Sequence, residues 1–165
     1  MKKAYFAGGC FWCIVPIFAN QNGVIKVYSG YSGGDEINPT YEQVKSQQTG
    51  HRESILIEYD EKIINYEFLL DLFLMNVDPF DPEGQFIDKG HSYTLAIYYQ
   101  DDDEKKLSKQ KIKKIQKDNN KEVYIAVEPF KKFYFAEQYH QDYYKKHPEK
   151  FLEELIKSGR KKNSQ

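Results

Sequence analysis

AYFAGGCFWC, residues 4–13, contains both cysteines and the only tryptophan of this chain. Its apolar start, residues 4–7, is typical of a strand, its two glycines allow a tight turn, and residues 11–18 are compatible with a helix. This order places Cys10 at the N-terminus of the helix. Unpaired backbone N–H groups and the helix dipole favour an anion there, so we expect the Cys10 thiolate to form more readily than at the free-cysteine pKa of about 8.5.

Cys13 follows Cys10 by one helical turn. Cα atoms three residues apart on a helix fall within the window of roughly 4.4–6.8 Å that a disulfide needs, so the spacing favours a redox site. Two other interpretations stay open, namely a pair of buried thiols and half of a zinc site completed by histidines. The zinc site is disfavoured because the nearest histidine pair, His140 and His147, is seven residues apart.

Composition predicts one globular domain over residues 1–165, with a polar C-terminal tail at about 158–165, because 40% of the residues are hydrophobic and 30% charged. A net charge of −1 gives no global basic field, so nucleic acid and membrane surfaces are not expected partners. The chain has no apolar targeting segment and no run of the ~20 apolar residues that span a membrane. We expect a cytoplasmic protein, and a monomer. In that reducing compartment a close cysteine pair is more often catalytic or metal-binding than structural.

Strand-like and helix-like segments alternate along the chain without a repeat or a long linker. The patterns predict strands at 24–28, 54–59, 93–99 and 123–127, a loop at 29–39, helices at 66–77 (capped by Asn65) and 102–117, and a helical tail from 136. The order βαββαβαβ predicts an α+β fold, a mixed β-sheet with packed helices akin to the ferredoxin-like (α-β plait) sandwich.

Three polar segments stand out among the predicted loops. They read NPTYEQV at 38–44, TGHRES at 49–54 and GQFIDKGHSY at 84–93. Functional groups gather on loops, but segments of this kind are more often turns with solvated side chains. Their residue chemistry alone therefore assigns them no function.

Together with the glycines and aromatic residues around Cys10, these segments resemble the methionine sulfoxide reductase A family, and the resemblance runs over most of the chain. The matching motifs are residues 8–12, GYSGG at 30–34, residues 38–41, residues 49–53, Gln85, Asp88, Gly90 and Tyr93 at the family's spacing, and FYFAEQYHQ at 133–141. Several motifs in the right order are more specific than any one of them.

The resemblance implies an enzyme of protein repair under oxidative stress that reduces methionine S-sulfoxide, protein-bound or free, to methionine. Cys10 matches the family's nucleophile, which attacks the sulfoxide sulfur and remains as a sulfenic acid. Glu53 matches the acid that protonates the sulfoxide oxygen, and burial must raise its pKa for that task. Tyr41 and Tyr93 match the tyrosines whose hydroxyls bind that oxygen.

Further matches concern the substrate's methyl group and the source of electrons. Phe11 and Trp12 match the aromatic walls around the S-methyl group, in keeping with the apolar faces beside the nucleophile. Asp88 matches a second acid near the site. The family implies no bound cofactor and no metal, and its reducing equivalents come from thioredoxin or other thiols.

The chain departs from many relatives in the residues that would recycle the nucleophile. It has Cys13 where they have glycine and Val15 where they have glutamate, and it lacks the C-terminal cysteines with which they resolve the sulfenic acid. Three possibilities stay open. Cys13 resolves the sulfenic acid by forming a disulfide with Cys10, an external thiol does so, or Cys13 is a packed, inert thiol.

Two rival classes of function also stay open. A general thiol-disulfide oxidoreductase would use Cys10 and Cys13 as a Cys-x-x-Cys pair on protein disulfides. A non-catalytic peptide-binding or zinc-binding module would use neither thiol as a nucleophile. Turnover of a methyl sulfoxide without reduction of insulin disulfides separates the predicted enzyme from the first, and a metal analysis tests the zinc form of the second.

Overall fold

The computed structural model describes residues 1–160, and the end of the predicted polar tail, residues 161–165, lies outside them. β1 (Lys2–Gly8) leads through a glycine turn into α1 (Phe11–Ala19), as predicted. The remaining elements are, in chain order, β2 (Val24–Ser32), α2 (Tyr41–Lys45), β3 (Arg52–Tyr59), α3 (Tyr66–Met75), β4 (Gly84–Gln85), β5 (Asp88–Lys89), the 3-10 helix η1 (His91–Tyr93), β6 (Leu95–Tyr99), α4 (Asp102–Asn119), β7 (Ile125–Pro129), β8 (Phe133–Phe135), the 3-10 helix η2 (Gln138–His140), α5 (Tyr143–Lys146) and α6 (Pro148–Lys157).

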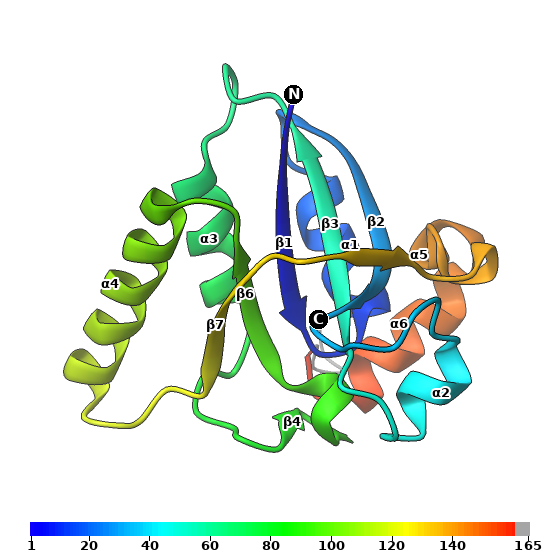
Figure 1. Ribbon diagram of the computed structural model, residues 1–165. Coiled ribbons are helices and arrows are strands. Elements are labelled where there is room, and N and C mark those ends of the chain that lie inside the picture. Colours follow the sequence, from blue (N-terminus) through cyan, green and yellow to red (C-terminus); the bar gives the residue numbers. More distant parts are fainter. Residues whose placement is uncertain (161–165) are drawn as a thin grey trace.

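A six-stranded sheet organises residues 1–160, with the strand order β7-β6-β1-β3-β2-β8, and β4 pairs with β5 in a separate hairpin. Neighbouring strands of the large sheet are antiparallel except for β6 and β7, which are parallel. The sheet is therefore mixed, and Figure 1 shows it curled with helices packed on it. This confirms the predicted α+β class with a mixed sheet. In the same residues, every helix is too short or too polar to cross a membrane.

The larger core lies between one face of the sheet and helices α1, α3 and α4. Phe6 of β1 stacks there on Phe73 of α3, with ring centroids 4.8 Å apart, and on Phe18 of α1 at 6.0 Å. Asn65 caps α3 by accepting a hydrogen bond from Phe68 N, as predicted. These contacts fix α1, and with it the cysteine pair, against the central strands.

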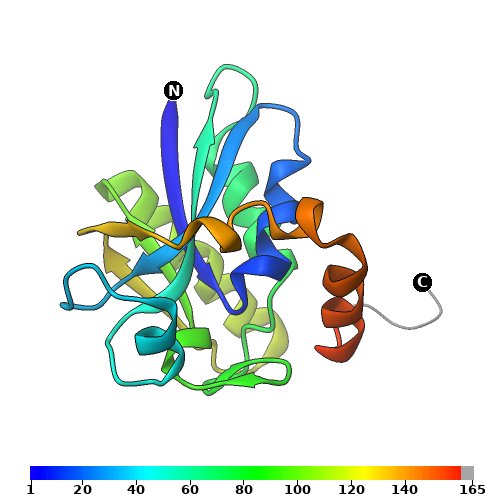
Figure 2. The same ribbon diagram turned by 90° about the vertical axis from the view of Figure 1, so that its right-hand side faces the viewer.

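A smaller core covers the opposite face of the sheet. The chain between β7 and β8 crosses this face in front of β1 and β3 (Figure 1), where Phe130 stacks on Tyr5 with ring centroids 3.8 Å apart. In the side view of Figure 2 this crossing and α6 lie on opposite sides of the molecule, with α1 between the sheet and α6. The N-terminus of α1 is thus enclosed by the sheet and the C-terminal helices.

The predicted loop at 29–39 is wrong for its first residues, because β2 continues to Ser32. Residues 30–32 pair with β3 on one side and with β8 on the other. Gly30 permits this close pairing, since a Cβ there would lie 2.2 Å from the ring of Phe133. The pairing joins segments about a hundred residues apart, which local sequence patterns do not reveal.

Other boundaries differ as well. The strand predicted at 93–99 begins only at Leu95, because His91–Tyr93 forms a 3-10 helix, so Tyr93 stands on a turn. The helix predicted at 66–77 ends at Met75, and the strand predicted at 123–127 spans Ile125–Pro129. The tail from 136 is a series of short helices rather than one, since Asp142 adopts a φ of 54° and Pro148 starts α6.

Candidate active site

Cys10 is the N-cap residue of α1, as predicted. The turn that presents it depends on Gly9, whose φ is +87° and whose Cβ, if present, would lie 2.8 Å from Cβ of Gln85. Cys10 is partly exposed and Cys13 is buried, and both thiols are free. The side chain of Cys10 makes no capping hydrogen bond to the helix.

Glu53, on β3, lies buried next to the start of α1. Its side chain is 2% exposed, and its Oε1 accepts a hydrogen bond from Phe11 N at 3.1 Å. Burial raises the pKa of this carboxyl group from 4.5 to about 8, against the lowering effect of the Phe11 hydrogen bond. Around neutral pH the site therefore holds a neutral carboxylic acid that has a proton to give.

The thiol of Cys10 does not behave as its place at a helix N-terminus predicts. Its pKa is raised well above the ordinary value, first by a hydrogen bond shared with Cys13, then by burial and by the charges of Glu53 and Asp88. The first N–H of the helix, on Phe11, is already bonded to Glu53 and is not available to a thiolate. The expectation of a readily formed Cys10 thiolate is therefore wrong for the unliganded protein.

The pKa of Cys13 shifts in the opposite direction. Its pKa is lowered, first by the hydrogen bond from Cys10 and then, against the effect of burial, by the positive charge of Arg160. The ionisation of each thiol affects the other, and Cys13 is the one that more easily becomes a thiolate.

Two tyrosines face Glu53 from separate segments. Tyr41 opens α2, which begins with a capping box between Thr40 and Gln43, and Tyr93 closes η1. Burial and then the charge of Glu53 raise the pKa of both phenols, so both hydroxyls stay protonated as hydrogen-bond donors. Gln47 links these two segments, because its Oε1 accepts a hydrogen bond from Ser92 N at 2.9 Å and its Nε2 donates one to Ser92 Oγ at 2.8 Å.

The two aromatic residues after Cys10 differ in exposure and in their contacts. Trp12 is partly exposed, stacks on Tyr143 with ring centroids 4.1 Å apart, and donates from Nε1 to His140 Nδ1 at 3.0 Å. Phe11 is 1% exposed and packs beneath, 6.4 Å from the Tyr41 ring. Trp12 is thus a fixed aromatic surface at the site, with Phe11 as its support.

Asp88 lies on β5 of the small hairpin, half-buried. Burial raises its pKa, and its charge in turn raises the pKa of Cys10 and of Glu53. Gln85, fully buried on the facing strand, anchors the hairpin through hydrogen bonds with the backbone of Asp78 at 2.8 and 2.7 Å. The eight residues predicted for the site come from five segments, and the structure gathers them around the N-terminus of α1.

Two residues at the site were not predicted from the sequence. Glu137 accepts hydrogen bonds from the Tyr31 hydroxyl at 2.8 Å and from Tyr41 N at 2.9 Å, which fixes the start of α2. His140 accepts the Trp12 N–H, and burial lowers its pKa to about 4, so its ring is neutral. Both lie in FYFAEQYHQ at 133–141, a motif that carries the resemblance but had been given no chemical role.

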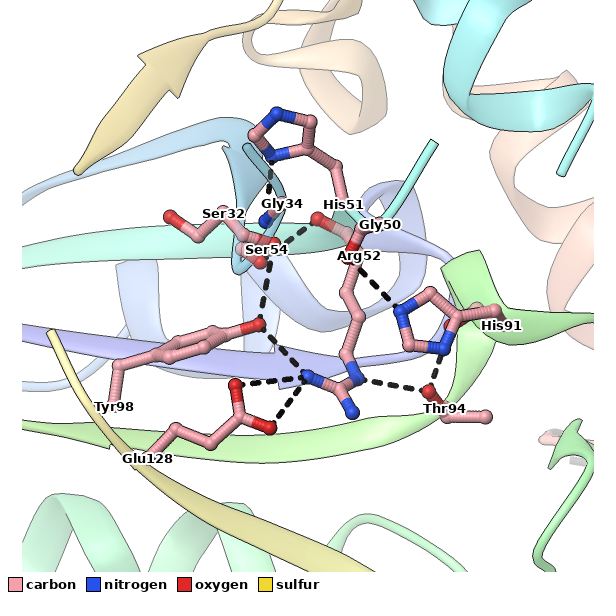
Figure 3. A network of polar contacts seen from close by, with 10 residues as sticks. All are labelled: Ser32, Gly34, Gly50, His51, Arg52, Ser54, His91, Thr94, Tyr98 and Glu128. Carbon is pink, nitrogen blue, oxygen red and sulfur yellow. Dashed lines mark hydrogen bonds and ion pairs between the residues drawn. The ribbon is translucent and has the colours of Figure 1, made fainter. Parts of the chain in front are cut away.

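A polar network on the other face of β3 supports the strand that carries Glu53 (Figure 3). The Arg52 guanidinium donates to Thr94 Oγ1 at 2.8 Å, to the Tyr98 hydroxyl at 3.3 Å and to the Glu128 carboxylate at 3.4 Å. Alternation along a strand sends Arg52 and Glu53 to opposite faces. The network therefore ties β3 to the residue after Tyr93 and holds both sides of the site in register.

Within residues 1–160 no group of three or more His, Cys, Asp or Glu side chains is arranged to hold a metal ion. The ring of His140 is bonded to Trp12, and the ring of His51 to Gly34 N and to the carbonyl of Glu36. These contacts leave the thiol pair with carboxyl, phenol and aromatic neighbours, a set suited to proton transfer and thiol chemistry.

Comparison with known proteins gives a consistent result. A family model described as peptide methionine sulfoxide reductase matches residues 2–165. The chain is 48% identical to the peptide methionine sulfoxide reductase MsrA of Bacillus licheniformis, over 96% of this chain and 89% of that protein. It is 45% identical to MsrA 2 of Staphylococcus aureus, over 98% and 93% respectively.

Solved structures show the same similarity in three dimensions. The reduced form of Mxr1 from Saccharomyces cerevisiae superposes with a TM-score of 0.83 at 28% identity, over 90% of this chain and 86% of that one. A crystal structure of Mxr1 in complex with Trx2 matches with a TM-score of 0.55 at 17% identity, over 81% of this chain and 78% of that one.

Proposed function

The chain belongs to the peptide methionine sulfoxide reductase family, and we propose from this premise that Cys10 and Glu53 carry out the reduction together. The protein is a peptide-methionine (S)-S-oxide reductase. The observation that carries the proposal is the buried Glu53 carboxyl group, which bonds the first amide of the helix capped by Cys10 and has a pKa of about 8. The nucleophile and a protonated acid thus lie together at the N-terminus of α1.

In the proposed reaction, the Cys10 sulfur attacks the sulfoxide sulfur while Glu53 gives its proton to the sulfoxide oxygen. An S–S bond forms between the two sulfur atoms as the oxygen is protonated. The hydroxyl group then moves to the Cys10 sulfur, the methionine S–O bond and the transient S–S bond break, methionine leaves, and Cys10 becomes a sulfenic acid. The methionine sulfur gains two electrons and the cysteine sulfur loses two. No proton is released overall, because the proton of the Cys10 thiol replaces the one that Glu53 gives.

We assign Tyr41 and Tyr93 to the sulfoxide oxygen. Burial keeps the protons on both phenols, and Glu53 also raises their pKa when it is ionised, so their hydroxyls are donors near the group that protonates the oxygen. Donors that are in place before the reaction stabilise developing charge without reorganisation. Asp88 acts indirectly, because its charge helps to keep Glu53 protonated.

The substrate's methyl group lies against Trp12 in this proposal. The indole is partly exposed and is fixed by Tyr143 and His140, and the buried Phe11 ring lies next to it with ring centroids 6.5 Å apart. An apolar wall beside the nucleophile favours the S-methyl group and excludes water. Both free and protein-bound methionine sulfoxide fit this assignment, since each presents the same methyl sulfoxide.

We further propose that Cys13 resolves the Cys10 sulfenic acid and that thioredoxin or another thiol reduces the resulting disulfide. The support is the hydrogen bond between the two thiols and the lowered pKa of Cys13. The yeast relative has been crystallised in complex with Trx2, which favours a thioredoxin as the reductant here. Recycling by thiols suits a reducing compartment such as the cytoplasm.

The fold that supports this site is inferred to contain a ferredoxin-like unit. Strands β1, β2, β3 and β6 with helices α1 and α3 follow the order βαββαβ, and the four strands are arranged β6-β1-β3-β2 in antiparallel pairs. In that interpretation β7, β8 and the remaining helices are additions at the edges of an α-β plait.

A comparison of Cys13→Ser with the wild-type protein tests the proposed cycle. The variant is expected to form one equivalent of methionine per enzyme and then to stall in a thioredoxin-coupled NADPH assay, because nothing resolves Cys10. Full thioredoxin-dependent turnover by Cys13→Ser would contradict the role of Cys13 and leave the first half of the reaction intact. Reduction of insulin disulfides by the wild-type protein would instead favour a general oxidoreductase.

A further inference from the structure

A cavity of about 560 Å³ is lined by Cys13 but not by Cys10. Its lining comes from α1, from the segment around Asn76 and from the C-terminal end of the described chain, and it includes Cys13, Phe86, Leu155 and Arg160. The proposed catalytic cycle uses Cys13 but does not explain why a cation lines the same space.

Arg160 is held at this place by three contacts. Its Nη2 donates to the carbonyl oxygen of Gly8 at 2.9 Å, its Nη1 donates to the carbonyl oxygen of Asn76 at 3.4 Å, and its guanidinium lies 4.6 Å from the centre of the Phe86 ring. Gly9 makes room for it, because a Cβ there would lie 2.9 Å from Nη2. The strand-to-helix turn of the cysteine motif is therefore shaped around this side chain.

Arg160 has no carboxylate partner within residues 1–160. The ion pairs found there involve other residues, and its buried Nε–H has no hydrogen-bond acceptor among them. Arg160 is partly buried, and burying part of a guanidinium without an anion beside it is costly. The ionisable groups that act on it are Cys13, Cys10 and Asp88, in that order. A thiolate at Cys13 would supply the missing negative charge.

We propose that Arg160 is a positioning residue for the recycling half of the reaction, which holds Cys13 as a thiolate ready to attack Cys10. This inference rests on the proposed role of Cys13. In the step, the Cys13 thiolate attacks the sulfur of the Cys10 sulfenic acid, an S–S bond forms, the S–O bond breaks, and the hydroxide that leaves takes up a proton to become water. The Cys13 sulfur is oxidised and the Cys10 sulfur is reduced, so no further oxidant is needed.

Several groups besides Arg160 act on Cys13 and enter any pH profile of this step. Cys10 donates a hydrogen bond to it, while Asp88 on β5 and Glu154 on α6 oppose its ionisation, and Glu53 on β3 is coupled to it. Arg160 is the cation among them, and its charge does not titrate near neutral pH. Its removal should therefore raise the pKa of Cys13 and move the resolving step to higher pH.

The test compares Arg160→Gln, Arg160→Lys and the control Lys157→Gln, which removes an exposed cation from the last position of α6, three residues before Arg160. Each protein is mixed with one equivalent of methionine sulfoxide without reductant at several values between about pH 5.5 and 9.5. Methionine, the disulfide and the dimedone-trapped Cys10 sulfenic acid are followed by quenched-flow mass spectrometry. Methionine formation in the same samples reports any general damage to the site.

For Arg160→Gln we expect disulfide formation to slow on the order of tenfold near pH 7, with accumulation of the trappable sulfenic acid and recovery at high pH, where Cys13 ionises unaided. Arg160→Lys should lie between this variant and the wild type, and Lys157→Gln should match the wild type. A pH midpoint for disulfide formation that Arg160→Gln leaves unchanged overturns the inference, as does an equal loss of methionine and disulfide formation. If Cys13→Ser turns over normally, the proposed role of Cys13 has failed instead.

Discussion

Replacing Glu53 by glutamine keeps the shape of the side chain and an acceptor for Phe11 N, but it removes the acidic proton. With a pKa of about 8, Glu53 is about nine-tenths protonated at pH 7 in the wild-type protein, so almost every molecule is ready to donate. General acid catalysis contributes about 10²–10⁴-fold, and we expect a loss of that size in the rate of methionine formation.

The assay is single-turnover methionine formation between about pH 5 and 10, quenched before recycling contributes. The wild-type rate should fall as pH rises through about 8, because the carboxyl group loses its proton there. Glu53→Gln should lack this decline and should recover part of its rate at low pH, where solvent supplies protons. An unchanged rate at pH 7, or a decline above pH 8 that persists in the variant, would refute the assignment of Glu53 as the acid.

The same variant has a consequence for stability. Burial raises the pKa of Glu53 from 4.5 to about 8, so the folded protein keeps a proton that the unfolded chain releases. The contribution of Glu53 to the free energy of unfolding is therefore largest below pH 4.5 and falls as the pH rises from 4.5 to about 8. Above about pH 8 this contribution, roughly 3–5 kcal/mol, is lost. Glutamine does not titrate, so urea unfolding should show Glu53→Gln gaining stability relative to the wild type from pH 5 to pH 9. A constant difference would mean that the carboxyl group has an ordinary pKa.

Racemic methionine sulfoxide should be consumed only to about half, with the R epimer left over, because Cys10, the hydroxyl donors and Trp12 fix three directions around a tetrahedral sulfur; equal loss of both epimers on a chiral column would contradict the pocket. Gly9→Ala should lower the free energy of unfolding in urea by about 1–3 kcal/mol, since its φ of +87° and its contact with Gln85 exclude a Cβ; an unchanged midpoint would show that the turn relaxes freely. Asp88→Asn should lower the pKa of Glu53 and move the alkaline decline of methionine formation to lower pH, and a shift to higher pH would reverse the assigned sign.

The sequence predicted best what depends on neighbouring residues. The strand, glycine turn and helix around Cys10 are signalled within residues 4–18, and the Asn65 cap lies three residues from its partner. The extension of β2 to Ser32 and the strand β8 were missed, because they stabilise each other through pairing across a hundred residues. Strand propensity is weak evidence until the partner strand is known.

For the site, too, the sequence predicted what local motifs signal and missed what depends on long-range contacts. The sequence motifs predicted Cys10, Glu53, Tyr41 and Tyr93, and the structure brings them together. The pKa of Cys10, however, is raised by Cys13, by burial and by charges that include Glu53 on another element. Glu53 accepts a hydrogen bond from Phe11 N, 42 residues away in the sequence. The bond from Trp12 to His140 spans 128 residues, and the bond from Arg160 to Gly8 spans 152. Such long-range contacts shape the site, and no local pattern predicts them.

The central claim, that the oxidation passes from the sulfoxide to the Cys10 sulfur, has one direct measurement. Cys13→Ser is mixed with one equivalent of the S epimer of methionine sulfoxide and dimedone without reductant, and the protein is then digested and analysed by peptide mass mapping. We predict one dimedone adduct per chain, on Cys10, for each methionine formed, and no methionine from Cys10→Ser. Methionine formed at the wild-type rate by Cys10→Ser, or formed by Cys13→Ser while Cys10 stays a free thiol, would contradict it.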